Sequence, residues 1–279
     1  MIRPVAVILA VAAGVVLTVA PSSSAPPLAQ RPTDPAPEVV PATSTPVAAP
    51  RAVTTQTLPL AGVRIGLDPG HQLGNSRFPA KIGRLVPAGG FLKPCNTTGT
   101  ATNSGYPEAS LNFAIVRSVQ VRLEKLGAQV FLTRSVNSAD TWGPCVDVRG
   151  RFGAKVGADL VVSVHGDGAP SADRGFHVIT PASRVPWTTD IAGDSRRLAI
   201  ALRDGFDHAG LPRSNYINHG YGLNTRWDLA TLNLSDVPVA MVEVGNMRNA
   251  TDARRMTSVA GRVRYAEAVV AGIRGYLGR

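Results

Sequence analysis

The stretch "VRIGLDPGHQLGN", residues 63–75, runs a short apolar strand directly into the turn Asp68-Pro69-Gly70-His71. Proline fixes the backbone and glycine tolerates a sharp turn, so these residues form a rigid corner. A histidine beside such a corner has two interpretations. It is an ordinary surface residue, or it presents an imidazole nitrogen to a metal ion. The choice depends on what the rest of the chain brings to the same place.

From residue 63 onward, apolar strands alternate with amphipathic helices. The apolar runs predict strands over residues 63–68, 128–134, 158–165 and 237–245. The spacing of apolar residues predicts helices over residues 106–127, 147–157, 195–210 and 253–277. Apolar strands that alternate with helices are typical of a parallel sheet covered on both faces. We therefore expect one α/β domain with a twisted, mostly parallel central sheet flanked by helices.

The first 59 residues differ in composition from this region. Residues 1–25 have an early arginine, an apolar run and small residues at the end, which predicts a secretory signal peptide; an uncleaved anchor is the alternative. Residues 26–59 are rich in Pro, Thr and Ala without apolar periodicity, so we expect a flexible tether before a folded domain at residues 60–279. We expect no stable membrane span after removal of the signal, and a secreted, periplasmic or wall-associated monomer.

The chain is strongly basic. Its formal charge is +10, and removal of the predicted signal takes away only Arg3, which leaves +9. Long-range attraction would favour an acidic partner such as an anionic cell-wall polymer. Nucleic acid is the rival partner, but the arginines are scattered and no basic-aromatic stacking pattern is present, so we expect no nucleic-acid binding.

Two cysteines, Cys95 and Cys145, are present in the chain. In a secreted protein such a pair favours one disulfide over two free thiols. Closing a loop of about 50 residues would stabilise the fold by about 4 kcal/mol in the chain-entropy model.

Three predicted strands end near residues that bind metals or move protons. The first leads through Asp68 to His71, the strand at 158–165 ends at His165, and the last strand carries Glu243 near its end. In open α/β sheets, ligands bind beyond the carboxyl ends of the strands, so we expect these side chains to lie together. Two histidines and one glutamate form the ligand set of a catalytic zinc site, which leaves a fourth position for water.

Each of these residues also has an ordinary explanation. His71 fits a surface loop, and His165 fits a core histidine that donates to a backbone carbonyl. Glu108 fits the first turn of a helix, where a carboxylate complements the helix dipole. Glu243 is harder to explain in this way, because a carboxylate within "VAMVEVG" is costly to bury unless it is paired or bound.

Several motifs occur together in a familiar order. They are Asp68 to His71 after a strand, Glu108 and Asn112 opening a helix, Leu132 to Arg134 ending a strand, Arg149 ahead of the strand from Ala158 to His165, and Pro238, Glu243, Gly245, Asn249 and Asp252 around the last strand. With these motifs, the region from Val63 to the C-terminus resembles the zinc-dependent N-acetylmuramoyl-L-alanine amidases of the bacterial cell wall, in particular their secreted single-domain mycobacterial and other actinobacterial members.

The resemblance implies that His71, Glu108 and His165 bind one zinc ion and that Glu243 is the catalytic carboxylate. It also implies hydrolysis of the amide bond between N-acetylmuramic acid and L-alanine of the stem peptide. The substrate would be peptidoglycan or its soluble muropeptide fragments, as part of cell-wall turnover.

Four further residues are candidates for supporting or substrate-binding roles. For Asp68 and Asn112 we expect contacts that orient the turn or the ligands. Arg149 would hold either a substrate carboxylate or a structural ion pair. His219, in "NHGYG", would line the groove or help to stabilise the oxyanion, or would simply occupy a loop.

The chain departs from the family pattern after His71. Gln72 and Leu73 follow where Gly-Gly is usual, an Asn usual near Ala154 is missing, and Glu108 stands 37 residues after His71, which is a wide spacing. We expect residues 76–104 to form a hairpin-like flap beside the zinc, clamped to the Cys145 loop by the disulfide. The alternative is a surface loop without a role.

Two other functions are compatible with the sequence. One is a different secreted zinc hydrolase, such as a carboxypeptidase or a deacetylase. The other is a non-catalytic cationic wall-binding protein, for which neither zinc nor Glu243 would matter. Identification of the reaction products distinguishes the three hypotheses.

Overall fold

A computed structural model describes residues 57–279 of the chain. The predicted signal peptide and nearly all of the predicted tether lie outside the described residues. The described residues belong to one compact unit, Thr54–Arg279. Among them, no helix is both long enough and apolar enough to cross a membrane.

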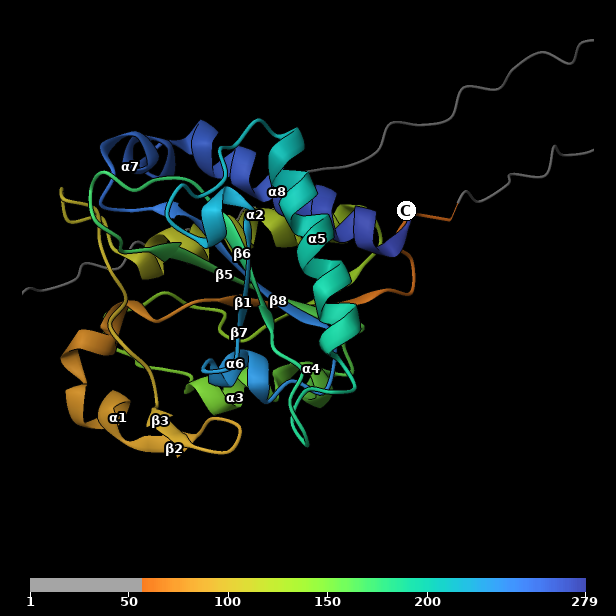
Figure 1. The fold of residues 1–279 in the computed structure, drawn as a ribbon, viewed down its shortest axis with the longest axis horizontal. Helices are drawn as coiled ribbons and strands as arrows, with labels where there is room; N and C mark the ends of the chain where they lie inside the picture. The colour runs from red at the N-terminus through yellow and green to blue at the C-terminus, as the bar shows by residue number, and fades with distance from the viewer. Residues whose placement is uncertain (1–56) are drawn as a thin grey trace, which may run out of the picture. The chain divides into compact units, whose positions relative to one another are not determined.

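Six strands form one sheet in the order β4-β1-β5-β8-β6-β7 (Figure 1). The strands are β1 (Arg64–Pro69), β4 (Gln129–Leu132), β5 (Leu160–Asp167), β6 (His177–Pro181), β7 (Leu223–Arg226) and β8 (Val239–Asn246). Strands β4, β1, β5 and β8 are parallel, whereas β6 runs antiparallel to β8 and parallel to β7. The expected mostly parallel sheet is confirmed. The apolar pattern did not predict β6 and β7, which are short and lie in irregular sequence.

Helices cover both faces of the sheet (Figure 1). One face carries α2 (Glu108–Lys125), α5 (Ala192–His208) and α8 (Val259–Leu277), with α7 (Ala250–Thr257) against α8. The other face carries the short helices α3 (Val146–Gly150), α4 (Phe152–Val156) and α6 (Ala230–Asn233). The single helices expected at 147–157 and 253–277 are each two helices. In the second case the reason is Ser258, whose extended backbone ends α7 and whose side chain accepts from Gly261 N to cap α8.

The alternation of side chains along the strands decides which residues face the cleft. On β8, Ala240 and Val242 belong to the large core under α2, α5 and α8, whereas Val239 and Met241 belong to a smaller core beside α6. Side chains two residues apart share a face, so Glu243 projects on the α6 side of the sheet. Strand β5 follows the same rule, because Val161 lies in the smaller core, and His165 therefore projects on that side as well.

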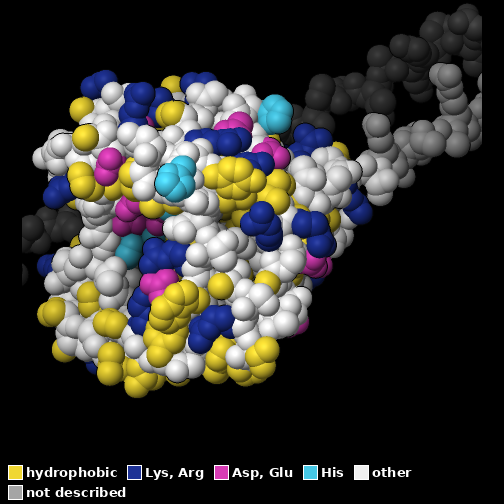
Figure 2. Space-filling view, in the orientation of Figure 1, with side chains coloured by type: hydrophobic (Ala, Val, Ile, Leu, Met, Phe, Trp, Pro, Cys, Tyr) yellow, Lys and Arg dark blue, Asp and Glu magenta, His cyan; other side chains and the backbone are white. Residues whose placement is uncertain are grey.

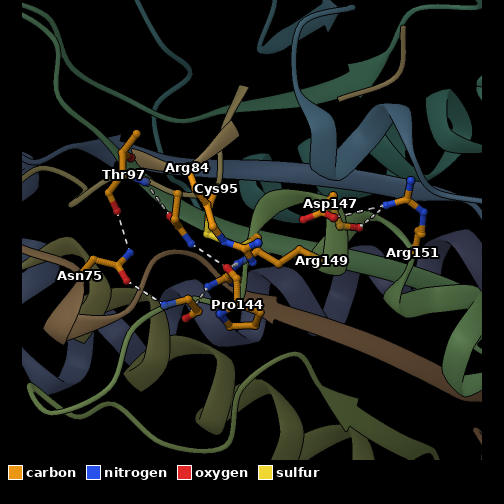
Figure 3. Close-up of a disulfide and its surroundings, with 11 residues drawn as sticks. Asn75, Arg84, Cys95, Thr97, Pro144, Asp147, Arg149 and Arg151 are labelled. Carbon is orange, nitrogen blue, oxygen red and sulfur yellow. Dashed lines mark hydrogen bonds and ion pairs between the residues drawn. A yellow bond between two sulfur atoms is a disulfide. The ribbon is translucent and has the colours of Figure 1, made fainter. Parts of the chain in front are cut away.

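The segment between β1 and α2 folds against the α3–α6 side. It contains η1 (Leu73–Arg77), α1 (Pro79–Gly83) and the antiparallel hairpin β2 (Leu85–Pro87) and β3 (Leu92–Pro94), which confirms the expected hairpin. The predicted disulfide between Cys95 and Cys145 is present. We call residues 76–104 the flap. Figure 3 shows Arg149 beside this disulfide, with its Nε donating to the carbonyl of Pro144 (3.0 Å).

Candidate active site

At the corner after β1, the backbone of Gly70 packs directly against the ring of His165. Gly70 N donates to Val164 O (3.0 Å), which draws the turn onto β5. A Cβ at Gly70 would lie 2.2 Å from His165 Cε1, so only glycine fits there. The next residue, His71, has φ 57°, in the left-handed region. That conformation costs about 1–3 kcal/mol for a residue other than glycine and must be held by its surroundings.

Two contacts hold His71. Arg149 donates from Nη2 to the carbonyl oxygen of His71 (2.8 Å), which fixes the strained backbone. The ring nitrogen Nδ1 lies 3.2 Å from the carbonyl oxygen of Thr97, a flap residue. Donation from Nδ1 to Thr97 leaves the lone pair on Nε2 of His71 available as a ligand.

Glu108 brings the two histidines together. Its Oε1 lies 3.2 Å from Nε2 of His71 and 2.9 Å from Nδ1 of His165. Its Oε2 accepts from the backbone N–H of Thr100 in the flap (2.9 Å). Asn112, one turn further along α2, donates to Oε1 and to the carbonyl oxygen of Gly70, each at 3.3 Å. The expected supporting role of Asn112 therefore has a structural counterpart.

The candidate ligand atoms of His71, Glu108 and His165 are close enough together to hold one metal ion. They all lie within 4.8 Å of one another. Two donors bound to one zinc at about 2.0–2.1 Å would be about 3.3 Å apart in tetrahedral geometry, and Oε1 of Glu108 lies at 3.2 Å and 2.9 Å from the two imidazole nitrogens. Burial raises the pKa of Glu108, but the two neighbouring imidazoles outweigh it and hold that pKa well below its usual range. The carboxylate is therefore ionised, as a metal ligand must be.

Asp68 and Arg149 form a buried ion pair beneath the corner. Asp68 is fully buried and Arg149 is 3% exposed. Asp68 also accepts from Ser163 Oγ (2.7 Å) and from Thr133 Oγ1. Burial raises the pKa of Asp68, but Arg149 and these hydrogen bonds outweigh it and lower the pKa to about 2. Of the two roles considered for Arg149, the structure places its guanidinium in the structural pair, at the wall of the cleft.

Arg134 also donates hydrogen bonds to this corner, a role that the sequence did not predict. Arg134 is buried, and it donates to the carbonyl oxygens of Pro69 (2.9 Å), Gly70 (3.2 Å) and Ala109 (2.9 Å). It thereby links the turn that carries His71 to the start of α2, where Glu108 lies. The motif "LTR" marked this position, but only the fold shows what the guanidinium contacts.

The cluster opens into a cleft of about 240 Å³. The face in Figure 2 is hollowed at mid-height, where histidine, acidic and basic side chains gather. Flap, strand and helix residues line the cleft: His71, Lys93, Pro94, Asn96, Thr97, Val146, Arg149, His165, Ile179, Arg226, Leu229, Ala230, Thr231, Met241 and Glu243. The cleft thus combines the His-Glu-His cluster at one end with apolar walls and two further cations, Lys93 and Arg226.

Glu243 stands beside the metal cluster. It pairs in register with His165 of β5, so their side chains are neighbours on one face. Burial raises the pKa of Glu243 well above its usual range, and the carboxylates of Glu108 and Asp167 act in the same direction. A carboxyl group with a raised pKa, next to the His-Glu-His cluster, is a candidate for general acid-base chemistry.

His219 is not part of this arrangement. It is exposed in η2 (Asn218–Gly220), in a left-handed conformation, and is not among the residues that line the cleft. His219 therefore occupies a loop position and does not line the cleft. His177 is the histidine that the structure brings close instead: it is buried, and it is the register partner of Glu243 on β6. No local pattern singled it out, because β6 itself was not predicted.

Comparison with known proteins gives a consistent family assignment. The family described as N-acetylmuramoyl-L-alanine amidase matches residues 65–275. The N-acetylmuramoyl-L-alanine amidase Rv3717 of Mycobacterium tuberculosis is 40% identical over 240 residues, which cover 86% of this chain and 95% of that protein. The crystal structure of the amidase Ami1 from Mycobacterium smegmatis has a TM-score of 0.73 and 41% identity, covering 78% of this chain and 98% of that one. The apo form of Ami1 from Mycobacterium abscessus has a TM-score of 0.72 and 41% identity, covering 78% and 100%.

The resemblance read from the motifs is confirmed by these matches. The family match extends from β1 through most of α8, and thus includes every residue of the His-Glu-His cluster as well as Glu243. The chain belongs to the N-acetylmuramoyl-L-alanine amidase family.

Proposed function

We propose that the protein is a zinc-dependent hydrolase that cleaves the amide bond between N-acetylmuramic acid and L-alanine in peptidoglycan or its muropeptide fragments. The observation that carries the proposal is the convergence of His71, Glu108 and His165 in a cleft where Glu243 is the register neighbour of His165. The family match supports the bond that is cleaved.

The donor set favours zinc. Two imidazole nitrogens and one carboxylate oxygen are typical ligands of a catalytic zinc site, whereas calcium prefers six or more oxygen ligands. When bound, zinc acts as a Lewis acid that polarises a carbonyl group and makes water more acidic. Thr97 and Asn112 contribute by orienting His71 and Glu108, so that the ligand atoms face one point.

Glu243 is the proton carrier in this proposal. It accepts a proton from the attacking water and returns it to the amine of L-alanine as the bond breaks. Burial raises its pKa above the usual range of a carboxyl, which makes it a stronger base than an exposed carboxylate. The apolar residues Ile179, Leu229 and Met241 line the same cleft and make the surroundings of the carboxylate less polar.

The flap forms one wall of the cleft and supports the metal ligands. Thr97 contacts His71, and Thr100 contacts Glu108. The hairpin is also attached to α6, because Asn233 donates to Ala88 O (2.8 Å). We infer that the flap restricts which substrates enter, and that it is not a loop without a role.

We further propose that the protein acts outside the cytoplasm, in the periplasm or at the cell wall, as a monomer. The predicted signal peptide and the positive charge support this location, since anionic wall polymers would attract the chain. Because the flap would restrict entry to the cleft, we expect soluble muropeptides to be hydrolysed faster than intact sacculi.

The decisive experiment is mass spectrometry of the products formed from a soluble muropeptide, with and without a chelator. An amidase releases a peptide with a free L-alanine amine and an intact sugar. Glu243→Gln should reduce kcat by at least about 100-fold while the zinc content stays unchanged. The exposed Glu267→Gln on α8 is the matched control and should behave as wild type. Release of free amino acids or acetate, or full activity without metal, would contradict the proposal.

A further inference from the structure

Glu243 lies between two histidines in the sheet. Strand β8 pairs with β5 on one side and with β6 on the other, and Glu243 is the register partner of both His165 and His177. Register partners on neighbouring strands project on the same face, with Cβ atoms about 5 Å apart. His165 belongs to the metal cluster. His177 has no role in the mechanism described above.

Both His177 and Glu243 carry a buried polar atom without a partner. His177 is 2% exposed. Its Nδ1 and the Oε2 of Glu243 have no hydrogen-bond partner among the described residues. Each such atom costs about 1–3 kcal/mol if it stays unsatisfied. His177 Nδ1 and Glu243 Oε2 belong to paired residues and make no direct hydrogen bond to each other. One water molecule between them would satisfy both atoms.

The surroundings of His177 keep its ring in place and neutral. The ring of Tyr216 packs edge-on against it, with centroids 6.1 Å apart, and the Tyr216 hydroxyl donates to Asp167 Oδ2 (2.7 Å). Burial lowers the pKa of His177 to about 4; Arg226 acts in the same direction and Asp167 opposes it. A neutral imidazole has one N–H to donate and adds no positive charge to the cleft.

We propose that His177 is a positioning residue for Glu243, which holds the carboxylate toward the cleft through a hydrogen bond bridged by one water molecule. The inference rests on the proposed function, because it takes Glu243 as the proton carrier. A carboxylate that is free to rotate would spend less time in the reactive orientation. Loss of the contact should therefore lower kcat and leave substrate binding almost unchanged.

The test compares His177→Leu with His177→Gln in the zinc-loaded protein, with initial rates on a soluble muropeptide. We expect kcat of the Leu variant to fall at least about tenfold, with KM within about twofold and zinc content unchanged. The Gln variant keeps an N–H donor and should recover most of the loss. Thr180→Val is the matched control: Thr180 is on the same strand, equally buried and also unpaired, but on the opposite face of the sheet.

A crystal structure of the zinc-loaded protein provides a second readout that does not depend on activity. It should show a water molecule between His177 Nδ1 and Glu243 Oε2, and in the Leu variant the carboxylate should turn or become disordered. Wild-type kcat in the Leu variant, a rise in KM at constant kcat, or a Gln variant as slow as the Leu variant would each overturn the inference. If the wild-type protein hydrolysed no muropeptide, the proposed function would fail, and the crystal structures would still decide the contact.

Discussion

The buried pair Asp68–Arg149 supports the corner that carries His71. Asp68→Asn removes the carboxylate charge with little change in volume, and leaves the guanidinium of Arg149 buried without its counter-ion. Arg149 also holds the carbonyl of His71, whose backbone is strained. We therefore expect the substitution to destabilise the fold and to weaken zinc binding together.

The magnitude follows from the pKa of Asp68. The pKa falls from 3.8 to about 2, and a tenfold change in acidity corresponds to about 1.4 kcal/mol, which gives about 2 kcal/mol. Breaking a buried ion pair by removing one partner typically costs about 3–5 kcal/mol. The Asn side chain keeps part of the hydrogen bonding to Ser163, so we expect a loss of about 2–3 kcal/mol in the free energy of unfolding at pH 7.

Urea unfolding of both proteins between pH 7 and pH 2 measures this value. The pKa of Asp68 is lower in the folded than in the unfolded state, so its stabilising effect is complete above pH 3.8 and is lost as the pH falls through about 2. The difference between wild type and variant should thus be constant near neutral pH and shrink below about pH 4. Asp140→Asn, which breaks the exposed pair with Arg77, is the control and should change little. A loss below about 1 kcal/mol at pH 7, or a difference that persists unchanged at pH 2, would refute the reasoning.

Three further predictions concern the flap and the metal. Replacing Cys95 and Cys145 together by Ala should lower the free energy of unfolding by about 4 kcal/mol in denaturant titrations, and an unchanged midpoint would contradict the loop-entropy argument. Asn233→Ala removes the donor to Ala88 O and should speed amide hydrogen exchange in β2 and β3, with a loss of about 1–2 kcal/mol; protected amides would show that other contacts hold the hairpin. A chelator should lower the melting temperature, and zinc should restore it while calcium does not; equal rescue by calcium would argue against the His-Glu-His ligand set.

The sequence was most informative where structure depends on nearby residues. The spacing of Leu111, Ile115 and Val119 along α2 predicted its buried face, and all three are fully buried. The apolar runs likewise predicted β1, β5 and β8, because a strand buried on both faces is apolar throughout. Strand β7 was missed because only Leu223 among its four residues is buried, and such a short segment has no recognisable period.

The sequence by itself placed His71, His165 and Glu243 near the ends of predicted strands, whereas Glu108 joined the candidate ligands only through the resemblance of the motifs to a known family. It also determined the family, since the motifs occur in order. Tertiary structure alone decided which side chains meet. It placed Arg149 against Asp68, left His219 exposed, and set His177 opposite Glu243. These contacts join residues 66 to 81 positions apart, and they depend on strand order and register, which a local pattern does not encode.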